Sequence, residues 1–243
     1  MESKIKFFCI NLPSRKDRWK NCCQQFRQQW MDVERWNATP LPENRRFGAW
    51  LSHREIIEEA QRNKWNYVWV FEDDIEFVVD NFIEQCISAI AELKNTDWYI
   101  LYFGWLIDKG GKLRKHADLK QVFQVEKLFE AHAVIYNERF YNIYLQKHPP
   151  KYSQEISEYY LDNSYTAFDQ WYAEYVQIKY PCFITKKILV VQKNDFSDIE
   201  WKKVWRKSRA EIIFIFYKYG LWKIVEYLWK YIKKILKILK IYM

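Results

Sequence analysis

Three consecutive carboxylates, Glu72, Asp73 and Asp74, follow a short apolar run at residues 67–71. That run contains only aromatic and β-branched residues, which predicts a buried strand. Buried strands in open α/β sheets present ligand-binding groups at their carboxyl ends. Adjacent carboxylates repel one another, and Mn²⁺ and Mg²⁺ prefer oxygen ligands, so the segment predicts a divalent cation site. The alternatives are an acidic turn in solvent, or a helix start that Asp73 or Asp74 caps.

A cation at this position can hold the phosphates of a nucleotide and stabilise them as a leaving group. Arg15 and Arg18 are candidates for contacts with the same ligand, since they lie three residues apart just after Pro13, which ends a strand predicted at residues 4–10. Ser14 is the predicted helix cap, and arginines near a helix N-terminus favour a phosphate or a uridine carbonyl. An ordinary basic helix start in solvent is the alternative.

Two further helices carry polar residues that can do chemistry. Ser52 and His53 lie in the first turns of a helix that apolar spacing predicts over residues 47–60. A single histidine on a helix is more often a packed residue than a catalyst. Asp169 lies between aromatic residues on a helix predicted at residues 167–174. An acid there can act as general base for a sugar hydroxyl, or it can be a helix-terminal charge.

The elements that must position these residues alternate along the chain. Strands are predicted at residues 4–10, 31–37 and 67–71, separated by helices at residues 14–29 and 47–60. This order predicts an α/β fold with a mainly parallel sheet and helices on both faces. Beyond it we expect a helix at residues 80–94, a helix at 137–147 capped by Asn137, and a flexible basic loop or hairpin tip at 109–115. Further strands are expected at residues 97–103, 121–127, 131–136, 178–184 and 188–191.

The net charge of +8 is unevenly distributed over the 243 residues. Residues 201–243 carry 12 Lys and Arg against 2 acids, whereas residues 1–200 carry 27 against 29. We therefore expect a catalytic domain at residues 1–200 and a basic tail at 201–243. The slightly acidic first part argues against a nucleic-acid partner.

The tail has helical apolar spacing from Leu221 to Leu239, with lysines on the other face. Its longest uncharged apolar run, residues 212–217, is far shorter than the roughly 20 residues of a spanning helix. The pattern predicts an amphipathic helix that binds an anionic membrane surface. A helix packed on the catalytic domain or on a second subunit is the alternative.

The cysteines and the N-terminus indicate a cytoplasmic setting. The five cysteines are an odd number and show no metal-ligand spacing, which argues for reduced thiols and against zinc. No long apolar signal region follows Met1, so export by a signal peptide is not expected. With the tail, this predicts a peripheral protein on the inner face of the cytoplasmic membrane.

Several motifs, taken in order, resemble glycosyltransferase family 25, which includes bacterial lipooligosaccharide galactosyltransferases and the collagen galactosyltransferases. Their order along residues 5–199 is that of the family. The matching residues are Ile10-Asn11-Leu12 with Arg15, Asp17 and Arg18; Gly48 with Leu51-Ser52-His53; Phe71-Glu72-Asp73-Asp74 with Phe77; Ala131-His132-Ala133; and Gln192 with Ser197-Asp198-Ile199.

The resemblance implies a Rossmann-like GT-A fold, a nucleotide-sugar donor such as UDP-galactose, and a divalent metal, commonly Mn²⁺. It implies a glycan or lipid-linked saccharide as acceptor, as in lipopolysaccharide biosynthesis. By this likeness Glu72, Asp73 and Asp74 form the metal and diphosphate motif. The donor would contact Asn11, Arg15, Arg18 and Asp73, with Ser52 and His53 near the same cleft.

Asp169 as the base is an inference from the residues, because the family has a different local context there. We expect a single displacement with inversion, in which Asp169 takes the proton of the acceptor hydroxyl. Two other classes of function remain open. One is a metal-dependent nucleic-acid enzyme, and the other is a non-catalytic glycan- or membrane-binding protein derived from this fold.

Overall fold

The computed structural model describes residues 5–42, 44–147, 168–193, 196–197 and 202–203. The predicted tail lies almost entirely at residues 204–243, outside the described residues. The predicted binding of the tail to a membrane therefore also concerns residues outside the described part of the chain. In the described part of the chain, no helix has the length and apolar character needed to cross a membrane.

The first part of the chain alternates as the sequence predicts. Strand β1 (Ile5–Asn11) leads to helix α1 (Lys16–Gln28), strand β2 (Glu34–Asn37), helix α2 (Arg45–Arg62) and strand β3 (Tyr67–Glu72). Both β2 and β3 pair with β1 in parallel. Because the three strands run the same way, their carboxyl ends meet at one edge of the sheet.

The predicted cap of α1 is wrong. Arg15 is the N-cap residue, and no side chain caps this helix by hydrogen bonding. Ser14 therefore lies one residue before the cap. The backbone N–H of Arg15 donates to the carbonyl of Leu12, so the chain turns through a backbone hydrogen bond of 2.9 Å between the strand and the helix. The other predicted cap is supported, because Asn137 Oδ1 accepts from the N–H of Arg139 at 3.1 Å.

After β3 the chain stops alternating. A short strand β4 (Ile75–Phe77) and helix α3 (Phe82–Glu92), extended by one 3₁₀ turn at Leu93–Asn95, precede β5 (Ile100–Tyr102). Four strands then follow without a helix between them: β5, β6 (Leu106–Arg114), β7 (Val122–Phe129) and β8 (Ala133–Asn137). The basic segment at residues 109–115, predicted as a flexible loop or hairpin tip, belongs to a hairpin in which β6 pairs antiparallel with β7, and most of it is strand.

Helix α4 (Glu138–Lys147) covers β8. The last helical segment that the structure describes has three parts. These are α6 (Phe168–Trp171), one turn of π-helix at Tyr172–Val176, and α7 (Gln177–Lys179). Strands β9 (Cys182–Thr185) and β10 (Val190–Gln192) follow, with the two-residue strands β11 (Phe196–Ser197) and β12 (Lys202–Lys203). The strand predicted from residue 178 is wrong at its start, because Gln177–Lys179 is helical.

The α/β class is confirmed, but the mainly parallel sheet is not. Among the described residues the main sheet has eight strands in the order β2-β1-β3-β8-β5-β9-β7-β6. The pairs β1·β2, β1·β3 and β5·β9 are parallel, whereas β3·β8, β5·β8, β7·β9 and β6·β7 are antiparallel. Parallel neighbours need a crossover connection, and the strands from β5 to β8 have none.

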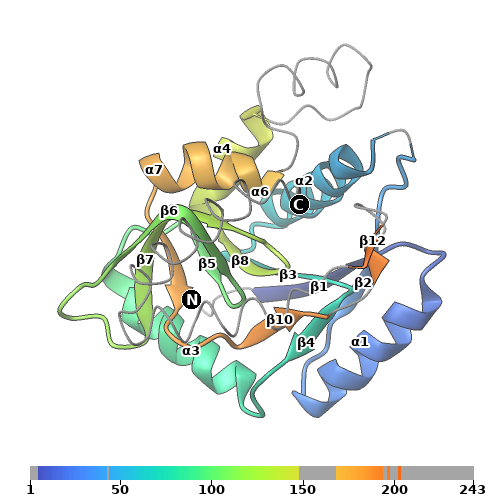
Figure 1. Cartoon of the computed structure of the whole chain (residues 1–243), viewed down its shortest axis with the longest axis horizontal. Helices are drawn as coiled ribbons and strands as arrows, with labels where there is room; N and C mark the ends of the chain where they lie inside the picture. The colour runs from blue at the N-terminus through green and yellow to red at the C-terminus, as the bar shows by residue number, and fades with distance from the viewer. Residues whose placement is uncertain (1–4, 43, 148–167, 194–195, 198–201, 204–243) are drawn as a thin grey trace, which may run out of the picture.

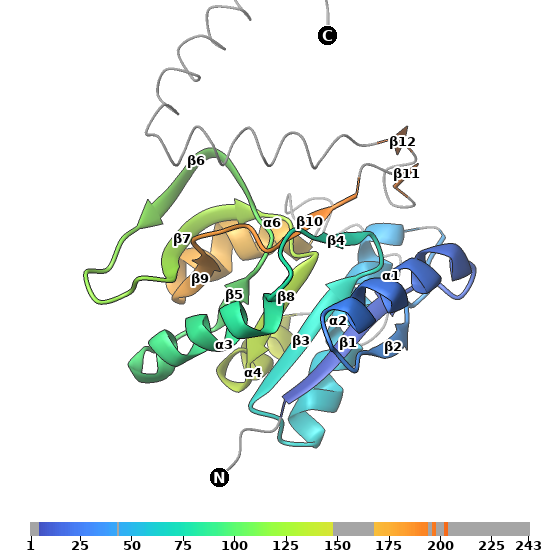
Figure 2. The same cartoon turned by 90° about the horizontal axis from the view of Figure 1, so that it is seen from below.

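Helices cover both faces of this sheet, as expected (Figure 1). Alternate residues of β3 divide between two cores: Val68 and Val70 pack with α2, α4 and α6, while Trp69 and Phe71 pack with α1 and α3. Figure 2 shows α1 and α3 in front of the sheet when the molecule is seen from below. Burial on both faces explains why this strand has no polar residue before Glu72.

Gly104, between β5 and β6, allows His132 and Val190 to approach the backbone closely. A Cβ atom there would lie 2.0 Å from Nε2 of His132 and 2.3 Å from the carbonyl oxygen of Val190. His132 precedes β8 and Val190 begins β10, so the glycine brings three segments together.

We predict that Gly104→Ala lowers the free energy of unfolding by about 1–3 kcal/mol or more, because neither the buried ring nor the carbonyl can give way. Urea unfolding measures this. Ser88→Ala, an exposed change on α3, is the control and is expected to stay within about 0.5 kcal/mol of the wild type. A wild-type unfolding curve for Gly104→Ala would contradict the contact.

Candidate functional site

The acidic segment lies where the sequence predicts, at the carboxyl end of a buried strand. Glu72 is the last residue of β3, and Asp73 and Asp74 form the turn into β4. All three carboxylates line a cleft of about 500 Å³. Helix α2, the segment at residues 38–42, the connection after β7 and the start of α6 line its other walls.

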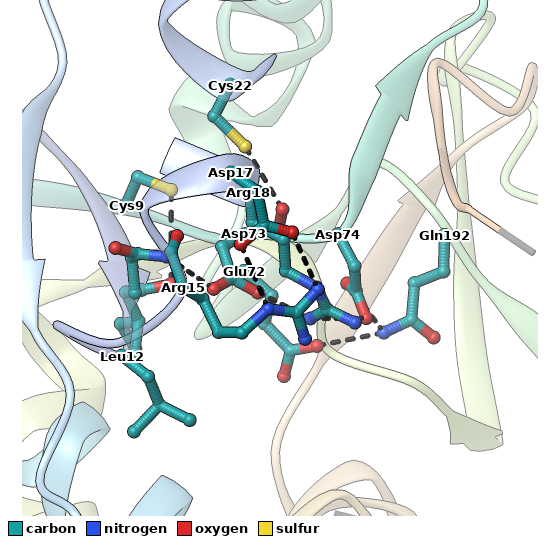
Figure 3. Close-up of polar contacts among 12 residues, drawn as sticks. Cys9, Leu12, Arg15, Asp17, Arg18, Cys22, Glu72, Asp73, Asp74 and Gln192 are labelled. Atoms are coloured by element: carbon teal, nitrogen blue, oxygen red, sulfur yellow. Dashed lines mark hydrogen bonds and ion pairs between the residues drawn. The ribbon is translucent and has the colours of Figure 1, made fainter. Parts of the chain in front are cut away.

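Asp73 is held by two side chains from the first strand–helix unit. Its Oδ2 accepts from Nδ2 of Asn11 at 2.6 Å, and its Oδ1 accepts from Nη1 of Arg18 at 2.7 Å. Asn11 ends β1, and its Nδ2 also donates to the carbonyl oxygen of Arg15 at 3.0 Å. Figure 3 shows Arg18 and Asp73 together with Cys22, whose thiol donates to the carbonyl oxygen of Asp73 at 3.2 Å.

Arg18 contacts two of these carboxylates. Its Nη1 lies 3.6 Å from Oδ2 of Asp74, in addition to the contact with Asp73. Burial alone would lower the pKa of the guanidinium, but the charges of Asp74 and Asp73 outweigh it and raise that pKa. Burial raises the pKa of Asp73 in turn, against the opposing effect of Arg18. Arg18 and the two aspartates therefore stabilise one another's charged forms, against the cost of burial.

Gln192 joins the other two carboxylates. Its Nε2 donates to Oε2 of Glu72 at 2.9 Å and to Oδ1 of Asp74 at 3.2 Å. The side chain comes from β10, which pairs antiparallel with β4, so it approaches the acidic turn from the partner strand (Figure 3). The N–H of Lys193 donates to the carbonyl oxygen of Asp74 at 2.7 Å and fixes this approach.

Arg15 has a different position from Arg18. Its guanidinium pairs with Asp17 through hydrogen bonds of 3.1 Å and 3.0 Å. The hydrogen bond from Arg15 is the main reason that the pKa of Asp17 falls to about 2. Arg15 does not line the cleft in the part of the chain that the structure describes, whereas Arg18 does.

Ser52 and His53 both line the cleft and are buried. The hydroxyl of Ser52 donates to the carbonyl oxygen of Gly48 and accepts from the N–H of Thr39, both at 2.9 Å. It therefore ties α2 to the segment at residues 38–42. His53 continues into a buried chain, with its Nδ1 2.8 Å from the hydroxyl of Tyr136 and that hydroxyl 2.9 Å from the hydroxyl of Tyr172.

Asp169 lies at the start of α6 and lines the same cleft. Its Oδ1 accepts from the N–H of Gln170 at 2.9 Å, and its Oδ2 accepts from the N–H of Glu130 at 3.3 Å. The structure thus brings together Arg18, Ser52, His53, the acidic segment and Asp169. Asn11 is 1% exposed and does not itself line the cleft. It is linked to the cleft through its hydrogen bond to Asp73.

Three charged residues that line this cleft have no role predicted from the sequence: Glu130, Arg45 and Arg46. Gln192 lines it too, and the sequence names it only as part of a matching motif. Arg45 and Arg46 open helix α2, so the rule that was applied to Arg15 and Arg18 would have found them. Gln192 is a polar residue at the end of an apolar strand, which is a signal of the same kind as Glu72. Glu130 has no such signal.

As to the metal, no group of three or more His, Cys, Asp or Glu side chains is arranged to hold an ion within the described ranges. Glu72 and Asp74 do converge, because one nitrogen of Gln192 is within hydrogen-bond distance of both. Asp73 has both carboxylate oxygens engaged by Asn11 and Arg18.

Comparisons with known proteins give distant structural similarity. No protein-family model matches the chain, and no curated protein matches it. Among solved structures, A197 from STIV covers 82% of this chain and 92% of its own, at 10% identity and a TM-score of 0.45. A glycosyltransferase involved in the glycosylation of the major capsid of PBCV-1 covers 74% of this chain and 80% of its own, at 10% identity and a TM-score of 0.46. Mannose-1-phosphate geranyltransferase from Thermus thermophilus covers 76% of this chain and 74% of its own, at 11% identity and a TM-score of 0.41.

We predict that His53 stays neutral across the physiological pH range, because burial lowers its pKa from 6.5 to about 3. The NMR signals of its ring should not move between pH 7.5 and 5.0, with His53→Gln identifying them. A midpoint near 6.5 would contradict the burial.

The same shift makes the folded protein less stable in acid. Below pH 6.5 the unfolded chain binds a proton that the folded chain does not, so His53 removes up to about 1.4 kcal/mol of stability per pH unit until its folded pKa is reached. Urea unfolding of the wild type and His53→Gln at pH 7.5 and 5.5 measures this difference.

Proposed function

We propose that this protein is a glycosyltransferase, which moves a sugar from a nucleotide-sugar donor to the hydroxyl of a saccharide acceptor. One observation carries the proposal: Glu72 Oε2 and Asp74 Oδ1 converge on one point, now taken by Nε2 of Gln192, in a cleft of about 500 Å³. Two carboxylates that converge inside a cleft of ligand size suit a divalent cation and the phosphates that it holds.

The residues present fit Mn²⁺ or Mg²⁺ in two respects. The two converging groups are hard oxygen donors, which these ions prefer. A half-turn of the Gln192 amide puts its carbonyl oxygen where its nitrogen now lies, and an amide oxygen is an acceptor that can join them. We assign the cation to Glu72, Asp74 and Gln192.

When bound, the cation supplies charge stabilisation to a diphosphate leaving group. Asp73 has a different task in this proposal. It binds Arg18 and Asn11, and so fixes the guanidinium beside Asp74, where the diphosphate would lie. Arg45 and Arg46 line the same cleft and bring two more positive charges that can contact the phosphates.

The other wall of the cleft suits a sugar and its acceptor. His53 is a neutral ring there, so it can exchange hydrogen bonds with a hydroxyl without adding charge. Asp169, the base predicted from the sequence, and Glu130 are the two carboxylates on this wall. Attack by the acceptor on the face opposite the leaving diphosphate would invert the anomeric centre. Galactose and UDP as the donor groups, and a lipid-linked acceptor, stay predictions from the sequence.

The proposed function is tested by thermal unfolding with Mn²⁺ and UDP, UDP-galactose or other nucleotide sugars, together with assays for release of UDP. A ligand at 100 times its Kd stabilises the wild type by roughly 2.7 kcal/mol, or about 5–10 °C in Tm. Asp74→Asn should lose the part of this shift that depends on Mn²⁺. Asp80→Asn, an exposed change six residues later, is the matched control and should keep it. An undiminished shift in Asp74→Asn would remove the cation from this segment.

Gln192→Glu tests the third ligand without an activity assay. A third carboxylate beside Glu72 and Asp74 removes their shared donor and adds repulsion, so Tm without metal should fall by several degrees. Mn²⁺ alone should then raise Tm more than it does in the wild type, because three carboxylates hold the ion. If Mn²⁺ stabilises Gln192→Glu no more than the wild type, Gln192 does not face the cation.

A further inference from the structure

The connection between β7 and β8 lies beside the acidic segment, although it is about 60 residues away in sequence. Strand β8 runs antiparallel to β3, so its first residue, Ala133, pairs with Phe71 at the end of β3. The N–H of Glu72 donates to the carbonyl oxygen of His132 at 2.8 Å. Glu130 and Ala131, which precede His132, therefore line the cleft that Glu72 lines.

Glu130 has a backbone conformation that is unfavourable for a residue with a side chain. Its φ is +71°, in the left-handed region that favours glycine. Among the described non-glycine residues, Trp30, Lys64 and Lys127 also have positive φ, but of these four Glu130 alone lines the cleft. Strain of this kind persists where the surrounding structure imposes it, and it gathers at functional sites.

The contact with Asp169 fixes this conformation. Oδ2 of Asp169 accepts from the N–H of Glu130 at 3.3 Å, while its Oδ1 accepts from the N–H of Gln170 at 2.9 Å. One carboxylate thus accepts from two backbone N–H groups, one in α6 and one in the connection after β7. Asp169 is thus suited to hold the chain at Glu130 in place.

The side chain of Glu130 rests against a buried ring. Its Oε2 lies 3.9 Å from Nδ1 of His132, and the Glu130 side chain is 12% exposed. The other edge of the His132 ring is also in contact with the chain. Its Nε2 lies 3.4 Å from the carbonyl oxygen of Val190, and the ring packs against Gly104. The carboxylate is therefore positioned by its backbone on one side and by a ring on the other.

We propose that Glu130 is the catalytic base of the transfer and that Asp169 is its positioning residue. This rests on the proposed function and replaces Asp169 in the role predicted from the sequence. The O–H bond of the acceptor breaks and its proton goes to the Glu130 carboxylate, while the acceptor oxygen bonds to the anomeric carbon. The bond from that carbon to the diphosphate oxygen breaks, and its electron pair leaves with the diphosphate.

Hydrolysis of UDP-galactose with Mn²⁺ tests this role without a known acceptor, because water then takes the place of the acceptor hydroxyl. Glu130→Gln keeps the shape of the side chain and should lower kcat by about 10²- to 10⁴-fold, the usual contribution of a general base. Its affinity for UDP with Mn²⁺ should stay within about two-fold of the wild type. Asp169→Asn should lower kcat less.

Glu130→Gly separates the base from a structural role. Glycine adopts a positive φ without strain, so this variant should unfold at a Tm at or above that of the wild type. It also leaves room for a small carboxylate, and added formate should restore part of kcat in Glu130→Gly. Formate should have no effect on Asp169→Gly. Lys127 also has a positive φ but does not line the cleft. Lys127→Gly is therefore the matched control and should keep the wild-type rate.

The outcomes separate this proposal from the proposed function. If the wild type releases UDP and Glu130→Gln keeps more than about a tenth of kcat, Glu130 is not the base and the proposed function stands. Rescue by formate in Asp169→Gly instead would return the role to Asp169. If the wild type releases no nucleotide from any nucleotide sugar with Mn²⁺, the proposed function fails and the role of Glu130 fails with it.

Discussion

Repulsion among three adjacent carboxylates is the constraint on which this structure depends. Glu72, Asp73 and Asp74 follow a strand that is buried on both faces, so they cannot move apart into solvent without breaking the centre of the sheet. Separate parts of the chain stabilise them: α1 supplies the positive charge of Arg18 and β1 the amide of Asn11 to Asp73, and β10 supplies the amide of Gln192 to Glu72 and Asp74. The elements far from the acids in sequence are arranged around that need.

The reversal of strand direction at β8 gives the cleft its second wall. If β8 ran parallel to β3, the connection that precedes it would lie at the opposite edge of the sheet. Because it runs antiparallel, Glu130 and Ala131 arrive at the edge where Glu72 lies, and the start of α6 joins them through Asp169. The segments up to β3, with Gln192 from β10, thus supply the groups suited to phosphate and cation, while the connection after β7 and the start of α6 supply Glu130 and Asp169 on the other wall.

This division explains what the sequence could predict and what it could not. Local patterns fix the elements up to β3, and parallel strands bring Asn11 and Asp73 together, so the contact of Arg18 with the acids follows from adjacent elements. The predicted contact of Arg15 with a ligand in the cleft did not follow in the same way. Asp17 is only two residues away and competes for the guanidinium of Arg15. Strand direction after β5 depends on which edges remain to be paired, which no local pattern records. Glu130 was missed for that reason, and its positive φ has no signature in a glutamate.

The buried hydroxyls behind His53 give this cleft a reversible polarity. In the row from Tyr172 through Tyr136 to the ring, either hydroxyl can be the donor, and the ring nitrogen takes the complementary role. Turning both O–H bonds favours the other tautomer of the imidazole, with no change in net charge or in heavy-atom positions. The second ring nitrogen therefore carries a proton in one arrangement and lacks it in the other, so the neutral ring can act as a donor or as an acceptor.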